Sequence, residues 1–139
     1  GPAEAFTLPP LGARVDLPGA GPEFQRAGKR APLANPMQGV VVARNPKLLA
    51  NPALAAQSPY AQGWLLLLEP TRLQRDTKKL LGGLEAEQWM EAETQRLSDL
   101  LTRQTGQRLA ATGGMLAPDI YGALPGLEWD GLVRDFLNP

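Results

Sequence analysis

The chain has 139 residues, with 14 basic and 14 acidic side chains and no cysteine or histidine. Its length predicts one domain with a hydrophobic core, and its balanced charge argues against non-specific binding to nucleic acid or anionic membranes. The lack of thiols and imidazoles excludes disulfides, thiol nucleophiles, imidazole bases and zinc sites with their usual ligands. No apolar run reaches the roughly 20 residues of a membrane span, so we expect protein partners and no direct membrane span.

The first part of the chain, residues 1–70, predicts a small β domain. Ten of the 14 prolines lie before position 60. Short apolar pieces at 5–8 and 40–43 alternate with turn signals such as Asn45-Pro46. Because each proline removes a backbone donor, long central strands are excluded in this region.

Helices are expected after Pro70, where the composition changes. Residues 71–81 predict a short helix that ends at Gly82-Gly83. Residues 84–104 predict a longer helix with an apolar stripe on one face. Four glutamates crowd its first half, where negative charge is favoured, and we interpret them as a solvated face without metal or acid-base chemistry. They are Glu85, Glu87, Glu91 and Glu93.

The end of the chain predicts an apolar tail with one more short amphipathic helix, at 127–137. The expected organisation is therefore a β domain at 1–70, a helical part at 71–105 and an additional tail at 106–139. No paired carboxylates, serine elbow or metal-ligand run is visible, so we expect no enzyme activity and no metal.

Three segments together resemble the H-protein of the glycine cleavage system: PMQGVVVARN (36–45), the N-P-x-L of 51–54 and PYAQGWL (59–65). The stretches LPPLGARV and KKLLGGLEAEQWMEA are also similar to that family, so the resemblance covers about residues 3–95. It implies an α+β fold, in which a lipoyl-like barrel-sandwich hybrid of two small sheets is followed by C-terminal helices. It also implies that the strands that open the family domain are absent from this chain, which leaves edges open to pairing.

The resemblance assigns structural roles to several positions. Gly39 and Gly63 suit positive φ or close backbone approach. The rings of Tyr60 and Trp64 are expected to supply core area. The loop motif also contains Asn51 and Pro52.

The family functions through a lipoyl group on a lysine at the tip of a β-hairpin, and here that position is ambiguous by one residue. Counting back from the Pro36–Gly39 turn without gaps places the lysine position at Gly28. If one residue is deleted relative to the family, the position falls on Lys29 instead, and the distance from Gly19 to Lys29 then equals the family's spacing from glycine to lysine. Small residues and proline at 27–32 form strands poorly. We therefore interpret this stretch as a solvated basic loop, with docking to an acidic partner as an alternative. Its cations are Arg26, Lys29 and Arg30.

The last expected strand carries leucines at 65–68, and Leu67 stands where the family has a lysine. Burying one leucine contributes roughly 2 kcal/mol, so a covering element is expected, either residues 127–137 or a partner protein. The predicted interaction surface consists of Leu66, Leu67, Leu68, Trp129, Leu132, Val133 and Phe136.

Two functions follow from the resemblance. The first is a non-catalytic interaction or scaffold subunit of a larger assembly, located in a bacterial cytoplasm, with the lipoyl arm lost and no cofactor. The alternative is a working carrier with a lipoyl group on Lys29, which shuttles an intermediate between enzymes.

Overall fold

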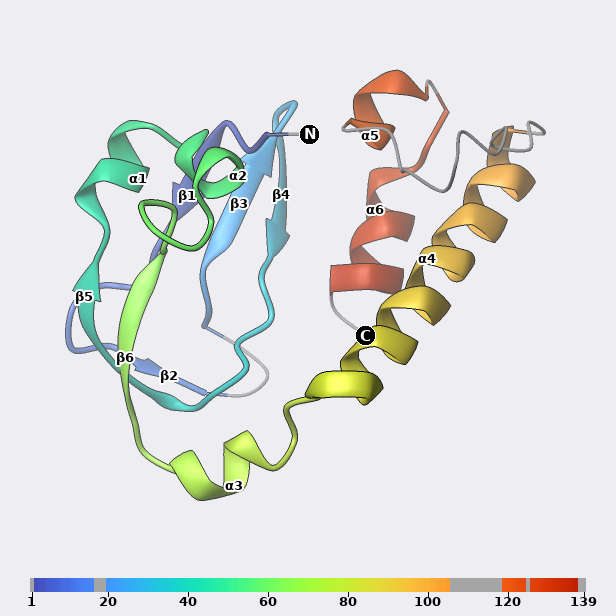
Figure 1. Cartoon of the computed structure of the whole chain (residues 1–139). Helices are drawn as coiled ribbons and strands as arrows, with labels where there is room; N and C mark the ends of the chain where they lie inside the picture. Colours follow the sequence, from blue (N-terminus) through green and yellow to red (C-terminus); the bar gives the residue numbers. More distant parts are fainter. Residues whose placement is uncertain (1, 17–19, 106–118, 125, 138–139) are drawn as a thin grey trace. The chain divides into compact units, whose positions relative to one another are not determined.

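The computed structural model describes residues 2–16, 20–105, 119–124 and 126–137 of an α+β protein (Figure 1). The chain divides into two units. One contains Pro2–Leu80 together with Val133–Pro139, and the other contains Leu81–Leu132. Each unit is described by itself below. The predicted division at residues 70 and 105 stays a prediction, and residues 106–118 of the expected tail lie outside the described residues.

The first sheet has the strand order β1-β3-β4, and both pairings are antiparallel. It consists of β1 (Ala5–Thr7), β3 (Glu23–Arg26) and β4 (Lys29–Pro32). Pro32 is compatible with β4 because an edge strand can spare a backbone donor. All strands are short, as the proline density predicts.

The second sheet has the order β2-β5-β6, again antiparallel, and no closed barrel forms within the described residues. Its strands are β2 (Arg14–Val15), β5 (Gly39–Arg44) and β6 (Leu66–Pro70). The register between β5 and β6 shifts at Val42, which has no partner in β6. This bulge bends the central strand of the sheet.

The core of the β-containing unit is small and mainly aliphatic. Both sheets contribute to it, because Ala31 comes from β4 whereas Val15 and Val41 come from β2 and β5. Leu48 joins them from α1 (Pro46–Ala50) and is fully buried. The loop between β5 and β6 thus supplies part of the core.

Three short helices complete this part of the chain: α1, α2 (Leu54–Gln57) and α3 (Leu73–Thr77). The helix predicted at 71–81 is shorter than expected, because it ends at Thr77 and Lys78 is its C-cap. Asp76 accounts for the placement of α3, since its buried carboxylate accepts a hydrogen bond from the backbone N–H of Gln38 (2.9 Å).

The long helix predicted at 84–104 is confirmed as α4 (Gly83–Thr105). Its unit also contains α5 (Ile120–Ala123) and α6 (Trp129–Leu132), and the rings of Tyr121 and Trp129 meet edge to face with centroids 5.1 Å apart.

The helix predicted at 127–137 forms as α6 followed by a π-helical segment, η1 (Val133–Leu137), which belongs to the β-containing unit and contacts β4 there. Within the described ranges, no helix is long and apolar enough to cross a bilayer.

Candidate functional site

The tip of the β3–β4 hairpin, where the family sets its lysine, is a two-residue turn. Arg26 pairs with Lys29, and the two residues between them, Ala27 and Gly28, have φ values of 49° and 72°. Positive φ at both central positions is the pattern of a type I′ turn, whose twist matches that of the flanking strands. Glycine is suited to its position, whereas alanine is strained there.

The tip corrects one expectation from the sequence. Residues 27–32 do not form a basic loop, because Ala31 and Pro32 pair with Phe24 and Glu23 in a regular ladder. Propensity is overridden here by tertiary packing, since Ala31 is completely buried. The hairpin is therefore a defined support for whatever the tip carries.

Lys29 is the first residue of β4 and is exposed. Because side chains alternate along a strand, Lys29 lies on the same face as Ala31, and Arg30 lies on the other face. Within the described residues, no hydrogen bond or ion pair holds the Lys29 side chain. The Arg26 guanidinium donates to the carbonyl oxygen of Pro2 (2.8 Å).

The structure thus places Gly28, and not Lys29, at the centre of the turn, as the register without gaps predicts. Gly19, whose spacing favours Lys29, lies outside the described residues. Whether Lys29 carries a lipoyl group stays a prediction.

A polar network lies around Asn45, at the end of β5. Its Nδ2 donates to the carbonyl oxygens of Gln62 and Trp64, both at 2.7 Å. Its Oδ1 accepts from the backbone N–H groups of Lys47 (3.0 Å) and Leu48 (3.3 Å), which caps α1. One buried side chain therefore fixes β5, α1 and the entry to β6 together.

For Gly39 and Gly63, the sequence left open whether they adopt positive φ or permit close backbone approach, and the structure shows close approach. Neither Gly39 nor Gly63 has positive φ. Instead, a Cβ on Gly63 would lie 2.4 Å from the carbonyl oxygen of Leu54, and one on Gly39 would lie 2.6 Å from that of Glu69. Close backbone approach explains both residues.

The expectation that Tyr60 supplies core area is wrong. Its side chain is completely exposed, with a relative accessibility of 102%, because the turn after α2 directs it into solvent. Trp64 is partly buried, and its carbonyl oxygen receives the Asn45 bond. The loop residues Asn51 and Pro52 precede α2, and the N–H of Asn51 caps α1.

The leucines of β6 alternate in burial although they do not alternate in sequence. Leu66 and Leu68 are partly buried, and Leu67 between them is 54% exposed. The segment η1, which lies in the same unit, contacts β4 of the first sheet, and Leu67 in the second sheet is exposed.

The C-terminal residues of the predicted interaction surface differ in burial. Trp129 is buried, whereas Leu132, Val133 and Phe136 are partly buried. Among the residues of the predicted interaction surface, Leu67 is the one that is strongly exposed, and its role in binding stays a prediction.

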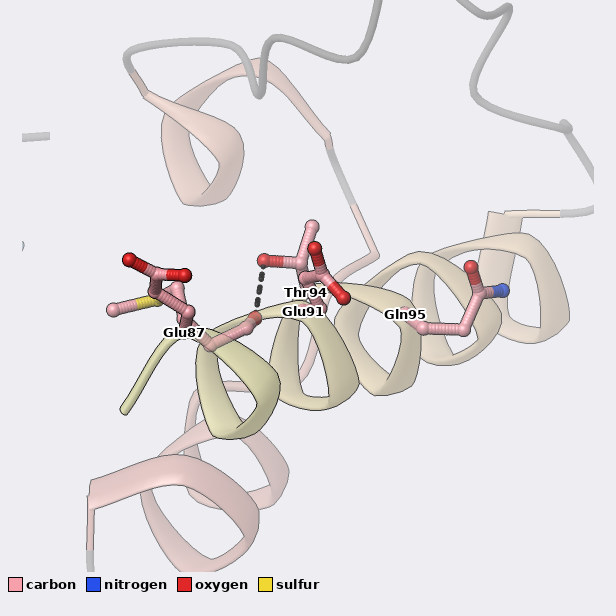
Figure 2. A pocket seen from close by; sticks show the side chains of 5 residues that line it. Glu87, Glu91, Thr94 and Gln95 are labelled. Atoms are coloured by element: carbon pink, nitrogen blue, oxygen red, sulfur yellow. Dashed lines mark hydrogen bonds between the residues drawn. The ribbon is translucent and has the colours of Figure 1, made fainter. Parts of the chain in front are cut away.

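A surface pocket of about 490 Å³ lies along α4 (Figure 2). Glu87, Glu91 and Gln95 line it from successive turns, and Thr94 Oγ1 donates to the carbonyl oxygen of Met90 (2.8 Å). Glu93 pairs with Arg96 at 2.6 Å. Among the described residues, no group of three or more acidic side chains is placed to hold a metal ion. We therefore interpret this pocket as a shallow groove between solvated side chains on the surface of α4.

The sequence analysis did not predict the hydrogen bonds that the buried side chains of Asn45 and Asp76 make. Asn45 stands in the recognised segment as the asparagine that ends the valine-rich strand, next to Pro46, and an Asn-Pro pair at a helix start is a capping signal. Asp76 gave no comparable signal, because its partner Gln38 lies far away in the sequence.

Comparison with known proteins places these features in a family. The model of the family described as glycine cleavage H-protein matches residues 2–93. The chain is 39% identical to glycine cleavage system H protein 2 of Aquifex aeolicus over 71 residues, which cover 50% of this chain and 44% of that protein. It is 37% identical to the glycine cleavage system H protein of a Synechococcus strain over 65 residues, which cover 40% of this chain and 50% of that protein.

The chain thus spans about half the length of the curated relatives that it matches. Among solved structures, a glycine cleavage system H protein from Mycobacterium marinum is 30% identical, with a TM-score of 0.48 and coverage of 51% of this chain and 56% of that one. The family match extends over more than half of the chain and contains the hairpin, the Asn45 network and both sheets. The chain therefore belongs to the glycine cleavage H-protein family.

Proposed function

We propose that this protein is a non-catalytic interaction subunit of a larger protein assembly, which keeps the H-protein framework and carries no lipoyl arm. The observation that supports this function best is the hairpin tip. Gly28 occupies the centre of the turn with a φ of 72°, and the adjacent lysine belongs to a strand. Without a lysine at the tip, the hairpin has no attachment point that projects along its axis.

The chemistry around the tip adds support. The cations Arg26, Lys29 and Arg30 surround the turn. The resemblance to the family implies acidic residues near the lysine at this position. A ligase that recognises an acidic tip would meet like charge here, which disfavours encounter. The function that remains is binding, and the location that we propose for it is a bacterial cytoplasm.

A second candidate function is that of a lipoyl carrier through Lys29. The observation that favours it is the position of this lysine, which is exposed and directly follows the turn on a well-formed hairpin. The relatives' names, glycine cleavage system H proteins, are consistent with it.

Intact mass separates the two functions. The chain is produced in cells that lipoylate their own proteins, with the Aquifex H protein 2 produced in parallel as a reference. We expect the mass of the unmodified chain. A mass increase by one lipoyl group that disappears in Lys29→Arg would replace the proposed function by the carrier function.

A further inference from the structure

We propose that η1 (Val133–Leu137) is a reversible cover of β4, the strand that follows the hairpin turn. A protein that binds the hairpin from the β4 side must first displace η1, so the segment acts as an autoinhibitory contact. The inference goes beyond the proposed function, because it holds whether or not Lys29 carries a lipoyl group.

The segment η1 lies outside the part of the chain that matches the family. The family model matches residues 2–93, and η1 follows that range. The residues before η1, Leu81–Leu132, form the helical unit, whereas η1 belongs to the β-containing unit and contacts β4 there. The contact with the hairpin is therefore an addition to the matched framework.

The apolar side chains of η1 share one face. Val133, Phe136 and Leu137 are partly buried, and Phe136 and Leu137 follow Val133 by three and four positions, the spacing of neighbours on a helix surface. Arg134, which lies outside this spacing, is exposed. Because η1 contacts β4, we assign the apolar face of η1 to the contact with this strand.

The outer edge of β4 suits a packed cover better than an added strand. The N–H of Leu33 donates to the carbonyl oxygen of Pro22 (2.8 Å), so these two residues form a hydrogen-bonded pair. Such pairs alternate along an antiparallel ladder, and the backbone groups of Arg30 and Pro32 therefore point away from β3. Proline has no N–H, so within β4 only Arg30 supplies a donor to this edge. A helical segment can cover such an edge without a ladder of hydrogen bonds.

The cover is held weakly enough to open. None of the five residues of η1 is fully buried, whereas Leu48 in the same unit is 0% exposed. Segments that bury few apolar side chains open locally at a lower free energy than the core. The segment is also π-helical, and π-helical turns are rare and frequently lie at functional sites. We therefore expect η1 to leave β4 transiently while both sheets stay folded.

Amide hydrogen exchange followed by NMR tests this opening in the unchanged protein. The reference is the buried residue Val41, whose N–H donates to the carbonyl oxygen of Ala13 (2.9 Å). We expect the amides of Phe136 and Leu137 to exchange about 100-fold faster than that of Val41, or more. Equal rates would show that η1 opens only when the whole unit unfolds, which would overturn the proposal.

The occupancy of β4 is tested with a synthetic peptide of residues 127–137, which is added to the full chain. In the double variant Val133→Ser, Phe136→Ser, the chain's own segment no longer holds β4. We expect the peptide to bind this variant with a Kd on the order of 100 µM, because the interface is small, and to shift the NMR signals of residues 29–32. In the unchanged chain, the tethered segment competes at a roughly millimolar effective concentration, so the peptide should bind about tenfold more weakly or worse.

The matched control is Arg134→Ser, which changes the exposed side of η1 and should leave peptide binding as weak as in the unchanged chain. The proposal is wrong if the peptide binds the unchanged chain and the double variant equally well, if it binds neither, or if no signal of β4 shifts. The exchange experiment needs no substitution, so it decides the case in which the double variant does not fold. A lipoyl group on Lys29 would overturn the proposed function without changing these results, so the two failures are distinguishable.

Discussion

The loop anchored by Asn45 and the tip of the β3–β4 hairpin differ in burial and in hydrogen bonding. At the anchor, Asn45 is 2% exposed and its side chain makes four hydrogen bonds, and Gly63 permits close backbone approach. At the tip, Ala27 and Gly28 are exposed, and alanine occupies a backbone conformation that costs it energy. The framework is thus constrained by packing, whereas the tip is free to change its chemistry without loss of the fold.

The largest expected effect lies at the anchor. Asn45→Ala should lower the free energy of unfolding by about 3 kcal/mol, because it removes the α1 cap and leaves the partly buried carbonyl oxygens of Gln62 and Trp64 without their donor. Urea denaturation followed by circular dichroism measures it. Asn45→Asp is the matched variant, since it keeps the cap but loses both donors. A loss below about 1 kcal/mol in Asn45→Ala would show that the network contributes little.

The second-largest loss of stability is expected at Gly63, where the backbone lies close to the carbonyl oxygen of Leu54. Gly63→Ala places a Cβ 2.4 Å from the Leu54 carbonyl oxygen and should destabilise the protein by about 2 kcal/mol through overpacking. Gly82→Ala is the control, because a Cβ there meets no atom within 4 Å. Thermal melts of both variants are compared. Equal melting temperatures would contradict the assigned role of Gly63.

At the hairpin tip, a substitution is expected to raise the free energy of unfolding instead of lowering it. Ala27→Asn should stabilise the protein by about 0.5–1 kcal/mol, since asparagine tolerates positive φ and Asn-Gly is the preferred pair in a type I′ turn. The same urea experiment measures it. Destabilisation by Ala27→Asn would mean that the turn does not have this conformation in solution.

The smallest effect is expected on the surface of α4. Arg96→Ala removes the ion pair with Glu93, and exposed pairs of this spacing contribute only about 0.3–0.5 kcal/mol. The shift in urea midpoint should also shrink when the measurement is repeated in high salt. An effect as large as that of Asn45→Ala would remove the contrast between framework and surface.

Much of the framework could be predicted from the sequence. Local signals located α4 and the strands β1 and β5, and the resemblance located the loop and both close-approach glycines. Long-range contacts could not be predicted, because the bond from Asp76 to Gln38 joins residues far apart in the chain. The pairing of Ala31 and Pro32 was also missed, since burial overrode weak strand propensity.

The site was predicted less completely. The sequence left Gly28 and Lys29 as equal registers, and only the pairing of Arg26 with Lys29 locates the turn. Tyr60 was assigned to the core from its residue type, but burial depends on the direction of the chain after α2. The exposure of Leu67 in a run of leucines depends likewise on the alternation imposed by the sheet.

The most direct test of the altered tip is a lipoylation reaction in vitro. The purified chain is incubated with a lipoyl ligase, ATP and lipoic acid, beside the Aquifex H protein 2, and both are followed by mass spectrometry. We predict that the reference gains a lipoyl group and that this chain, whose turn holds Gly28, does not. A lipoyl group mapped to Lys29 at a rate similar to that of the reference would contradict the account.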